Sequence, residues 1–531
     1  MMENKNHKHS ASSQIEDLLK HYSNKNYLKA IDKAHEILNL IPANHSIEKI
    51  LASSLKNIGK ASQAISIFKN ILDSNADDGE AMFGLANAYL ELKHYDDAIT
   101  YYKKLIRLSS DNVEAYNNLG IALLAIQDFK EAEYFLKKSL ELKFNNASTH
   151  NNLGIVLCAK GKFKAAEESF LTAIRINHNY LQGYKNLADL YFLVGKKRKL
   201  VKTLQKVIEL SPRNVSALNQ LGAAYNSLEL YERAEDSFKE AILINPSDSG
   251  AQYNLGLVYY KNKDFFNALE HFKLSKLRSA KNHVLKCLYA LDQKAAFYEH
   301  LDSMISSNEN NAVIGSIISA SNLQYNSKKE NIFCQNPFNF IYTNDLNSDN
   351  SFDKKIASKI RNIFDMPKLP LRPQGLLMNG VQTYGNIFNL NLPGISFIEN
   401  ILRDELDKFL VLFKDSNEGF IKKWPKKFKL YGWLIKMSSG GELLPHMHET
   451  GWITGSLYIN IPKKLRSDEG NLMLTIDNRD RPLSRDMSIK KNIIVQSGTI
   501  CLFPASLLHY TTPFESKEDR IVLAFDMIPN E

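Results

Sequence analysis

The sequence predicts an α+β chain in two parts: an all-α superhelix of eight helical hairpins, followed by a double-stranded β-helix, or jelly-roll, domain. Two observations carry this prediction. A period of 34 residues runs through residues 13–280, and 34 residues is the length of one helix–turn–helix repeat. After about residue 350 the helical periodicity gives way to short β-rich runs separated by turn-forming residues, which is typical of a sandwich or barrel.

Length, composition and charge are those of a globular protein with more than one domain. A chain of 531 residues is too long for one core and should divide into roughly two to four domains. Its 44% hydrophobic and 24% charged residues exclude an intrinsically disordered chain. The net charge of +9, from 67 basic and 58 acidic residues, is spread along the whole length and indicates solvated helix faces. We therefore expect no nucleic-acid partner.

Cysteine usage and hydropathy indicate a cytoplasmic protein without a membrane segment. The four cysteines are too few and too far apart for a disulfide framework or a thiolate metal cluster. The first residues lack the apolar run of a signal peptide, and no apolar stretch of eighteen residues occurs. The sequence also lacks a Gly-rich phosphate loop and a dinucleotide-binding fingerprint in the right context, so kinase and glycosyltransferase activities have no support.

Small residues recur once per repeat at two positions, where the paired helices must approach each other closely. The first series is Ala30, Ala64, Ala98, Ala132, Ala166, Ala234 and Ala268. The second, each time preceded by leucine, is Ala52, Ala86, Gly120, Gly154, Ala188, Gly222 and Gly256. Leu200 breaks the first series and predicts a wider crossing, or a kink, in the sixth repeat. We expect all of these positions to form the packed core between helices.

The phased small residues resemble those of tetratricopeptide repeats. Two further series strengthen the resemblance: an aromatic residue at Tyr89, Tyr191, Tyr225 and Tyr259, and a proline that closes the repeat at Pro42, Pro212 and Pro246. The resemblance implies a solenoid whose concave face binds a protein or peptide. Asparagines recur near that face at Asn87, Asn117, Asn118, Asn151, Asn152, Asn186, Asn219 and Asn254. They are either donors and acceptors for a peptide backbone or merely polar residues on an exposed helix, and the sequence leaves both interpretations open.

The rest of the chain divides by composition. We expect a disordered tail over residues 1–12, capping helices and a connecting region over 281–345, and the jelly-roll domain over 346–531. Helices are predicted at His283–Ser307 and Gly394–Phe413. Strands are predicted at Leu430–Met437, Thr454–Ile461, Leu472–Ile476, Ile493–Val495, Thr499–Phe503 and Ile521–Met527.

Three histidines of the β-rich region have the spacing of metal ligands. His446 and His448 stand two residues apart on an extended segment, so their side chains point the same way. His509 follows the strand Thr499–Phe503, and a later strand of a jelly roll can bring it opposite the first pair. Neutral imidazoles suit iron, zinc or copper, and a facial three-ligand set leaves coordination positions open. Arg520 opens the last predicted strand.

The order His-x-His, a gap of about sixty residues, His, and then Arg resembles the iron(II)- and 2-oxoglutarate-dependent oxygenases. More narrowly, it is similar to the branch that follows tetratricopeptide repeats in bacterial proteins, and the resemblance covers roughly residues 331–531. Its other motifs are Gly380-Val381-Gln382-Thr383, Asn386-Ile387-Phe388, Gly432-Trp433, Gly440-Gly441, Glu449 through Gly455, Tyr458, Pro462, Gly498 and Phe503-Pro504.

This resemblance implies an iron(II) held by His446, His509 and the residue at position 448, with 2-oxoglutarate as co-substrate and O2 as oxidant. Arg520 would bind the distal carboxylate of 2-oxoglutarate. Tyr458 either donates a hydrogen bond to the co-substrate or is a packed core tyrosine. Most members of the superfamily carry Asp or Glu where His448 stands, so Glu449 or Asp477 is an alternative third ligand.

The sequence therefore favours an iron- and 2-oxoglutarate-dependent dioxygenase that hydroxylates an unreactive C–H bond, with a repeat array that recruits a protein or peptide substrate. One alternative is a non-catalytic scaffold whose jelly roll is a degenerate metal-binding domain. Another is a cupin-like enzyme of a different kind, such as a three-histidine dioxygenase or isomerase. Arg520 favours the first reading over the last, because a jelly roll without the co-substrate has less need of that cation.

Overall fold

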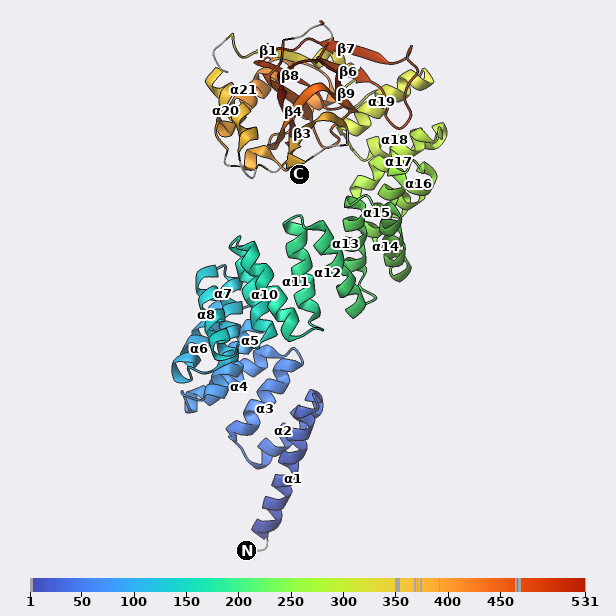
Figure 1. The fold of residues 1–531 in the computed structure, drawn as a ribbon. Coiled ribbons are helices and arrows are strands. Elements are labelled where there is room, and N and C mark those ends of the chain that lie inside the picture. Colours follow the sequence, from blue (N-terminus) through green and yellow to red (C-terminus); the bar gives the residue numbers. More distant parts are fainter. Residues whose placement is uncertain are drawn as a thin grey trace. The chain divides into compact units, whose positions relative to one another are not determined.

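The structure, a computed structural model, describes residues 3–348, 354–366, 369, 371–372, 375–390, 392–463, 466 and 469–530 (Figure 1). Internal contacts divide the chain into two units, Met1–Pro246 and Ser247–Glu531. Within the described part of the chain, no helix has both the length and the apolar character needed to cross a membrane.

Seven helical hairpins make up the described part of the first unit. The helices are α1 (Glu3–Ser23), α2 (Tyr27–Leu40), α3 (His45–Asn57), α4 (Ala61–Ser74), α5 (Gly79–Glu91), α6 (Tyr95–Leu108), α7 (Val113–Ala125), α8 (Phe129–Leu142), α9 (Ala147–Ala159), α10 (Phe163–Ile176), α11 (Leu181–Leu193), α12 (Lys197–Leu210), α13 (Val215–Ser227) and α14 (Tyr231–Ile244). Helix α1 begins at Glu3, so the disordered tail expected over residues 1–12 is wrong from that residue on. Met1 and Met2 lie outside the described residues.

An Asn or Asp side chain caps the first helix of most hairpins, again with a period of 34. Each accepts a hydrogen bond from a backbone N–H two or three residues further on, which satisfies a donor that the first helical turn leaves unpaired. These caps are Asn44, Asp78, Asn112, Asn146, Asn214 and Asp248. In the sixth repeat Tyr180 takes this position and makes no such bond.

The small residues lie where a bulky side chain of the second helix fills the crossing, as predicted. A Cβ atom on Gly154 would stand 2.5 Å from a ring carbon of Phe170, sixteen residues later. The same spacing pairs Gly120 with Leu136, Gly222 with Phe238, and Gly256 with Phe272. At the exceptional position the side chain of Leu200 is buried in the first turn of helix α12, and the wider crossing or kink expected there stays a prediction.

Asparagines hydrogen-bond one another between successive hairpins of the first unit. The side chain of Asn118 donates to Asn87, that of Asn152 donates to Asn117, and that of Asn186 donates to Asn151. The donor and acceptor lie 31 or 35 residues apart, so each bond joins neighbouring repeats. These amides therefore hold the stack together, a role that neither interpretation of the sequence included.

The second unit begins with the eighth hairpin and three further helices, followed by the sheet domain. The helices are α15 (Ser249–Lys261), α16 (Phe265–Leu274), α17 (Arg278–Ala290), α18 (Lys294–Ser306) and α19 (Ala312–Tyr325), and, within the sheet domain, α20 (Lys354–Arg361), α21 (Ile395–Phe413) and α22 (Gly419–Lys422). The helix predicted at His283–Ser307 is thus parts of two helices, α17 and α18, with a turn between them.

The sheet domain is a jelly roll, which confirms the predicted fold class. Its strands are β1 (Tyr342–Asp345), β2 (Leu371–Arg372), β3 (Leu377–Thr383), β4 (Phe428–His446), β5 (Ile453–Asn460), β6 (Leu472–Ile476), β7 (Ile489–Ile493), β8 (Thr499–Pro504), β9 (Leu508–Thr511) and β10 (Arg520–Pro529). They pair in the order β1-β8-β5-β10-β4-β9-β6-β7, with β3 also on β4 and β2 on β3. All pairs are antiparallel.

The long strand β4 belongs to two layers. Its first half pairs with β10, and its end pairs with β9, so the chain passes from the sheet β8-β5-β10-β4 to the sheet β4-β9-β6-β7. Alternate residues of the first sheet point to opposite faces. Leu457 packs outward in one apolar cluster with helix α21, while the adjacent Tyr458 packs inward against β6 and β7.

Three details of the sequence prediction are corrected. Strand β1 lies before residue 346 and pairs with β8, so the jelly-roll domain begins earlier than expected. The strand predicted at Ile493–Val495 is β7, which ends at Ile493. Strands β3 and β9 were not predicted, and β9 is the later strand that carries His509.

Candidate metal centre and co-substrate pocket

Three predicted histidines meet at one end of the jelly roll. His446 ends β4, His448 lies two residues beyond it, and His509 lies on β9, directly opposite His446 in the ladder. One nitrogen atom from each ring lies within 4.8 Å of the others. The fold thus explains how residues more than sixty positions apart meet: the bend in β4 carries the first pair into the layer that contains β9.

Hydrogen bonds fix which nitrogen of His446 and of His448 faces the cluster. Nδ1 of His446 lies 2.9 Å from the carbonyl oxygen of Leu444, and Nδ1 of His448 lies 2.7 Å from Oδ1 of Asp526. Both partners are acceptors, so each Nδ1 carries the proton and donates it. The lone pair of each ring is then on Nε2, the atom available to a metal ion.

Burial and repulsion from neighbouring rings keep the imidazoles of His446 and His509 neutral. Burial lowers the pKa of His446 to about 4, and the neighbouring His448 adds to the shift. The pKa of His509 lies well below its usual value, because its ring is buried and because both other histidines would repel its proton. Neutral imidazole is the form that binds metal ions, so His446 and His509 stay in that form across the physiological range.

The two carboxylates considered as alternative third ligands are occupied elsewhere. Glu449 forms an ion pair with Lys286 of helix α17. Asp477 accepts hydrogen bonds from the backbone N–H groups of Asn478 and Leu483 and closes its own loop. Within the described part of the chain, one group of three or more His, Cys, Asp or Glu side chains could together hold a metal ion, namely His446, His448 and His509.

Arg520 lies inside the barrel, where one narrow cavity is lined by it, by Tyr458 and by all three histidines. Its guanidinium is 2% exposed and donates from Nη2 to the carbonyl oxygen of Gly470 at 3.1 Å. Nε is buried without a hydrogen-bond partner. Glu469 lines a neighbouring recess with Arg520, yet among the described residues no carboxylate forms an ion pair with this cation.

Aromatic rings position these polar groups. The guanidinium of Arg520 lies 5.1 Å from the ring centroid of Tyr458, a distance at which a cation is attracted to the ring face. Burial raises the pKa of the Tyr458 hydroxyl well above its usual value, so the hydroxyl remains protonated. Trp433 packs edge-on against His448 with ring centroids 5.0 Å apart. Trp452 belongs to the core and donates from Nε1 to the carbonyl of Phe420.

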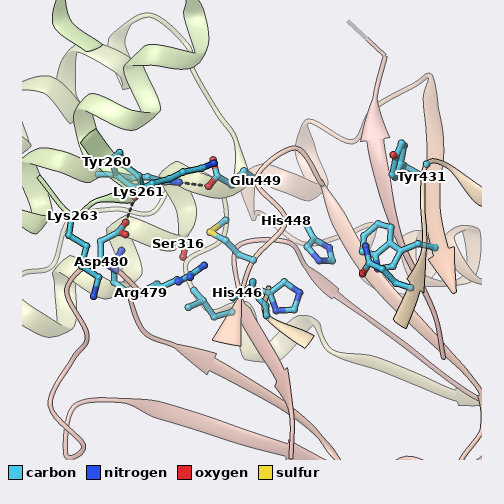
Figure 2. A pocket seen from close by; sticks show the side chains of 18 of the residues that line it. Tyr260, Lys261, Lys263, Ser316, Tyr431, His446, His448, Glu449, Arg479 and Asp480 are labelled. Carbon is cyan, nitrogen blue, oxygen red and sulfur yellow. Dashed lines mark hydrogen bonds and ion pairs between the residues drawn. The ribbon is translucent and has the colours of Figure 1, made fainter. Parts of the chain in front are cut away.

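A second, wider cavity of about 620 Å³ opens over the histidines. Figure 2 shows His446 and His448 on its floor, with Arg479 and Asp480 on one side and Tyr431 on the other. Residues of α15, α17 and α19 complete the wall. The site therefore has a narrow interior chamber and an open outer cleft that share the same histidines.

Sequence reasoning missed Asp526 and Gln382 as site residues. Asp526 is buried on β10, where Oδ1 accepts hydrogen bonds from both His448 and Thr454. A charged residue within the otherwise apolar run from Ile521 to Met527 was the available signal. Gln382 is 3% exposed, lines the outer cleft and has an unpartnered amide oxygen; it stood in a motif, but strand β3 had not been predicted.

Comparisons with known proteins agree with this architecture. Residues 431–526 match the family described as "Putative 2OG-Fe(II) oxygenase". Residues 86–127, 113–143 and 215–248 match tetratricopeptide repeat families. No curated protein matches the chain.

Among solved structures, the repeats are similar to a tetratricopeptide repeat protein from Parabacteroides merdae, with 21% identity over 47% of this chain and 99% of that one, and a TM-score of 0.37. MamA gives 26% identity over 30% and 95%, with a TM-score of 0.29. YrrB, described as a TPR protein with an unusual peptide-binding site, gives 23% identity over 35% and 95%, with a TM-score of 0.31. The chain therefore combines tetratricopeptide repeats with a C-terminal domain of the 2OG-Fe(II) oxygenase family at residues 431–526.

Proposed function

We propose that the chain is an iron(II)- and 2-oxoglutarate-dependent dioxygenase that hydroxylates a protein or peptide recruited by its repeats. The observation that carries the proposal is the single narrow cavity lined by His446, His448, His509 and the buried cation of Arg520. A buried guanidinium with an unpartnered Nε needs an anion to offset its desolvation.

The donor set fits both groups. Three imidazoles, two of them oriented by hydrogen bonds from Nδ1, suit iron(II). Arg520 presents a rigid set of N–H donors that matches a carboxylate in a bidentate contact, so it would bind the distal carboxylate of 2-oxoglutarate. Tyr458 packs beside that guanidinium and limits its movement. His448 is the proposed third ligand, because Glu449 and Asp477 have other partners.

Bound iron would supply the activation of O2, coupled to oxidative decarboxylation of the co-substrate. The reaction balances as one 2-oxoglutarate, one O2 and one C–H bond giving succinate, CO2 and one C–OH group. One oxygen atom enters the new carboxylate of succinate and the other enters the substrate. The residues of the chain orient the co-substrate at Arg520 and leave the outer cleft above the histidines for the substrate.

The repeats supply the proposed recruiting element, and a cytoplasmic location remains our expectation. Tetratricopeptide arrays form extended concave surfaces that bind other chains. The eighth hairpin, α15 and α16, lies in the same unit as the jelly roll, and α15 contributes to the outer cleft. A polypeptide held along the last repeats would therefore have a route to the histidines.

The test is anaerobic titration of the purified full chain with iron(II) and then 2-oxoglutarate, followed by succinate formation in air. We expect His509→Ala to abolish iron binding and the exposed His35→Ala to leave it unchanged. Arg520→Gln should retain iron but bind 2-oxoglutarate about 10-fold to 100-fold more weakly, the loss expected for a charge-assisted contact. A wild-type chain that binds neither iron nor 2-oxoglutarate, and forms no more succinate than His509→Ala, would leave only the scaffold role.

A further inference from the structure

The outer cleft is built jointly by the end of the repeat array and the jelly roll. Tyr260 of α15, Lys286 of α17 and Ser316 of α19 line it together with His446 and His448. All of these residues belong to the second unit. A substrate that reaches the histidines through this cleft therefore also contacts the last repeats (Figure 2).

Polar pairs fix the helical wall against the loops of the jelly roll. The hydroxyl of Tyr260 donates to Asp480, and Lys286 forms its ion pair with Glu449. Next to them, Arg481 forms an ion pair with Asp292 and stacks over Tyr289 and Tyr325 at 5.8 and 5.6 Å. The side chain of Lys286 is only 11% exposed, so its ion pair is poorly screened by solvent. These contacts therefore hold the helices and the jelly-roll loops together on the two sides of the cleft.

These pairs leave the cleft with uncompensated positive charge. The acidic residues among its described lining are Glu449 and Asp480, and both already have partners. Arg479 and Lys263 line the same cleft and form no ion pair within the described part of the chain. Arg479 and His446 line the same cleft. A cation with free donors therefore stands next to the proposed metal centre.

Gln382 supplies an independent observation in the same cleft. Its side chain is 3% exposed on β3, and its amide oxygen is buried without a partner. An unsatisfied buried acceptor is unfavourable, and a donor from a bound ligand would offset that loss. Every residue of a polypeptide except proline offers one such donor, its backbone N–H group.

We propose that the outer cleft binds an acidic segment of a polypeptide substrate, with Arg479 holding a side-chain oxyanion and Gln382 accepting a hydrogen bond from the backbone. This inference rests on the proposed oxygenase function only for the reaction that the bound segment undergoes. The binding of the segment does not depend on that function. Arg479 acts as the specificity-determining residue, because its planar donors match a carboxylate or a phosphate. Because Gln382 contacts the peptide backbone, it contributes affinity that does not depend on the side chain that Arg479 binds.

Fluorescence anisotropy with the metal-free full chain tests this division of roles. The probes are fluorescein-labelled nonapeptides with a Gly-Ser backbone that carry three Glu, three Gln or three phosphoserine residues. We expect the Glu peptide to bind about tenfold more tightly than the Gln peptide, as for one charge-assisted contact. Arg479→Gln should remove that preference, and Gln382→Leu should weaken both peptides by the same factor. Arg485→Gln, a substitution of an exposed arginine outside the cleft with the same change in net charge, should leave the preference intact.

Several results would overturn the inference. Equal binding of the Glu and Gln peptides would exclude oxyanion recognition, and equal effects of Arg479→Gln and Arg485→Gln would reduce it to a non-specific charge effect. The phosphoserine peptide reports which oxyanion is preferred and supports the site if its binding also depends on Arg479. Free glutarate that displaces the Glu peptide at the same carboxylate concentration would overturn the polypeptide as the occupant.

The binding test is independent of the proposed oxygenase activity. Because the probes are measured without metal, a chain that binds the Glu peptide through Arg479 but takes up no iron would contradict the oxygenase function alone. A chain that binds iron and 2-oxoglutarate but shows no preference for the Glu peptide would contradict the inference on the cleft alone.

Discussion

Replacing Asp526 by asparagine tests how the proposed metal centre is supported. The carboxylate is 4% exposed on β10, and Oδ1 accepts from Nδ1 of His448 at 2.7 Å and from Oγ1 of Thr454 at 2.9 Å. Asparagine has nearly the same shape and can keep an acceptor toward the ring. The substitution therefore removes the negative charge while leaving the packing almost unchanged.

The expected magnitude follows from that geometry. A charge-assisted hydrogen bond is roughly twice as strong as a neutral one, and loss of a partner that orients a metal-binding histidine costs about 10-fold to 100-fold in metal affinity. Because the amide still accepts one hydrogen bond, we place Asp526→Asn near the lower end, at about tenfold. Thr454→Val, which removes only the second bond to Oδ1, should have a smaller effect.

The assay is anaerobic calorimetric titration of iron(II) into the full chain, with cobalt(II) absorption as a spectroscopic check on ligand geometry. Glu405→Gln is the matched control, because Glu405 is also a buried carboxylate of the jelly-roll domain, hydrogen-bonded to Tyr342 and Asn344 far from the histidines. Iron affinity of Asp526→Asn equal to that of wild type would refute the reasoning, as would an equal loss in Glu405→Gln.

Two further predictions concern the repeats. Gly154→Ala should destabilise the array in urea unfolding by about 1–2 kcal/mol, because overpacking outweighs the gain in helix propensity. The new Cβ atom would stand 2.5 Å from the buried ring of Phe170. A stabilised variant would contradict the packing argument. Glu133→Gln should lower the melting temperature at neutral pH. Hydrogen bonds from Lys137, Lys160 and Lys162 hold the pKa of Glu133 at about 2, below its unfolded value. The stability that this depressed pKa contributes is present above about pH 4.5 and is lost as the pH falls toward 2. The melting temperatures of wild type and Glu133→Gln should therefore converge on acidification. A difference in melting temperature that does not depend on pH would contradict this prediction.

The helical repeats could be predicted almost completely from the sequence, because their physical causes are local and periodic. The small residues at each crossing repeat every 34 positions, and each hairpin packs on its neighbours. The period also contains the Asn and Asp caps at the helix starts. What the period does not contain is which amides bond across repeats, because the pair Asn118 and Asn87 depends on the three-dimensional offset between hairpins.

The jelly roll was predictable as a class but not in its details. Short strands such as β1, β2 and β9 have two to four residues, too few for an alternating pattern to stand out. The helical wall of the cleft was not predictable, because ion pairs such as Lys286 with Glu449 join residues that are 163 positions apart. The histidines and Arg520 were found because each is an unusual residue at a strand end, whereas Gln382 and Arg479 look like ordinary polar residues in sequence.

Position 448 shows why ligand identity alone is an incomplete description of such a centre. A histidine there removes the carboxylate that the related oxygenases place next to iron, which by itself would leave the site without a negative charge. The structure places that charge one residue further out, on Asp526, in direct hydrogen-bond contact with the ring of His448. A carboxylate in this position increases the basicity of the imidazole and fixes its orientation. In the proposed metal centre, Asp526 would therefore contribute its negative charge through His448, and Asp526→Asn should change iron affinity even though no proposed ligand atom has been altered.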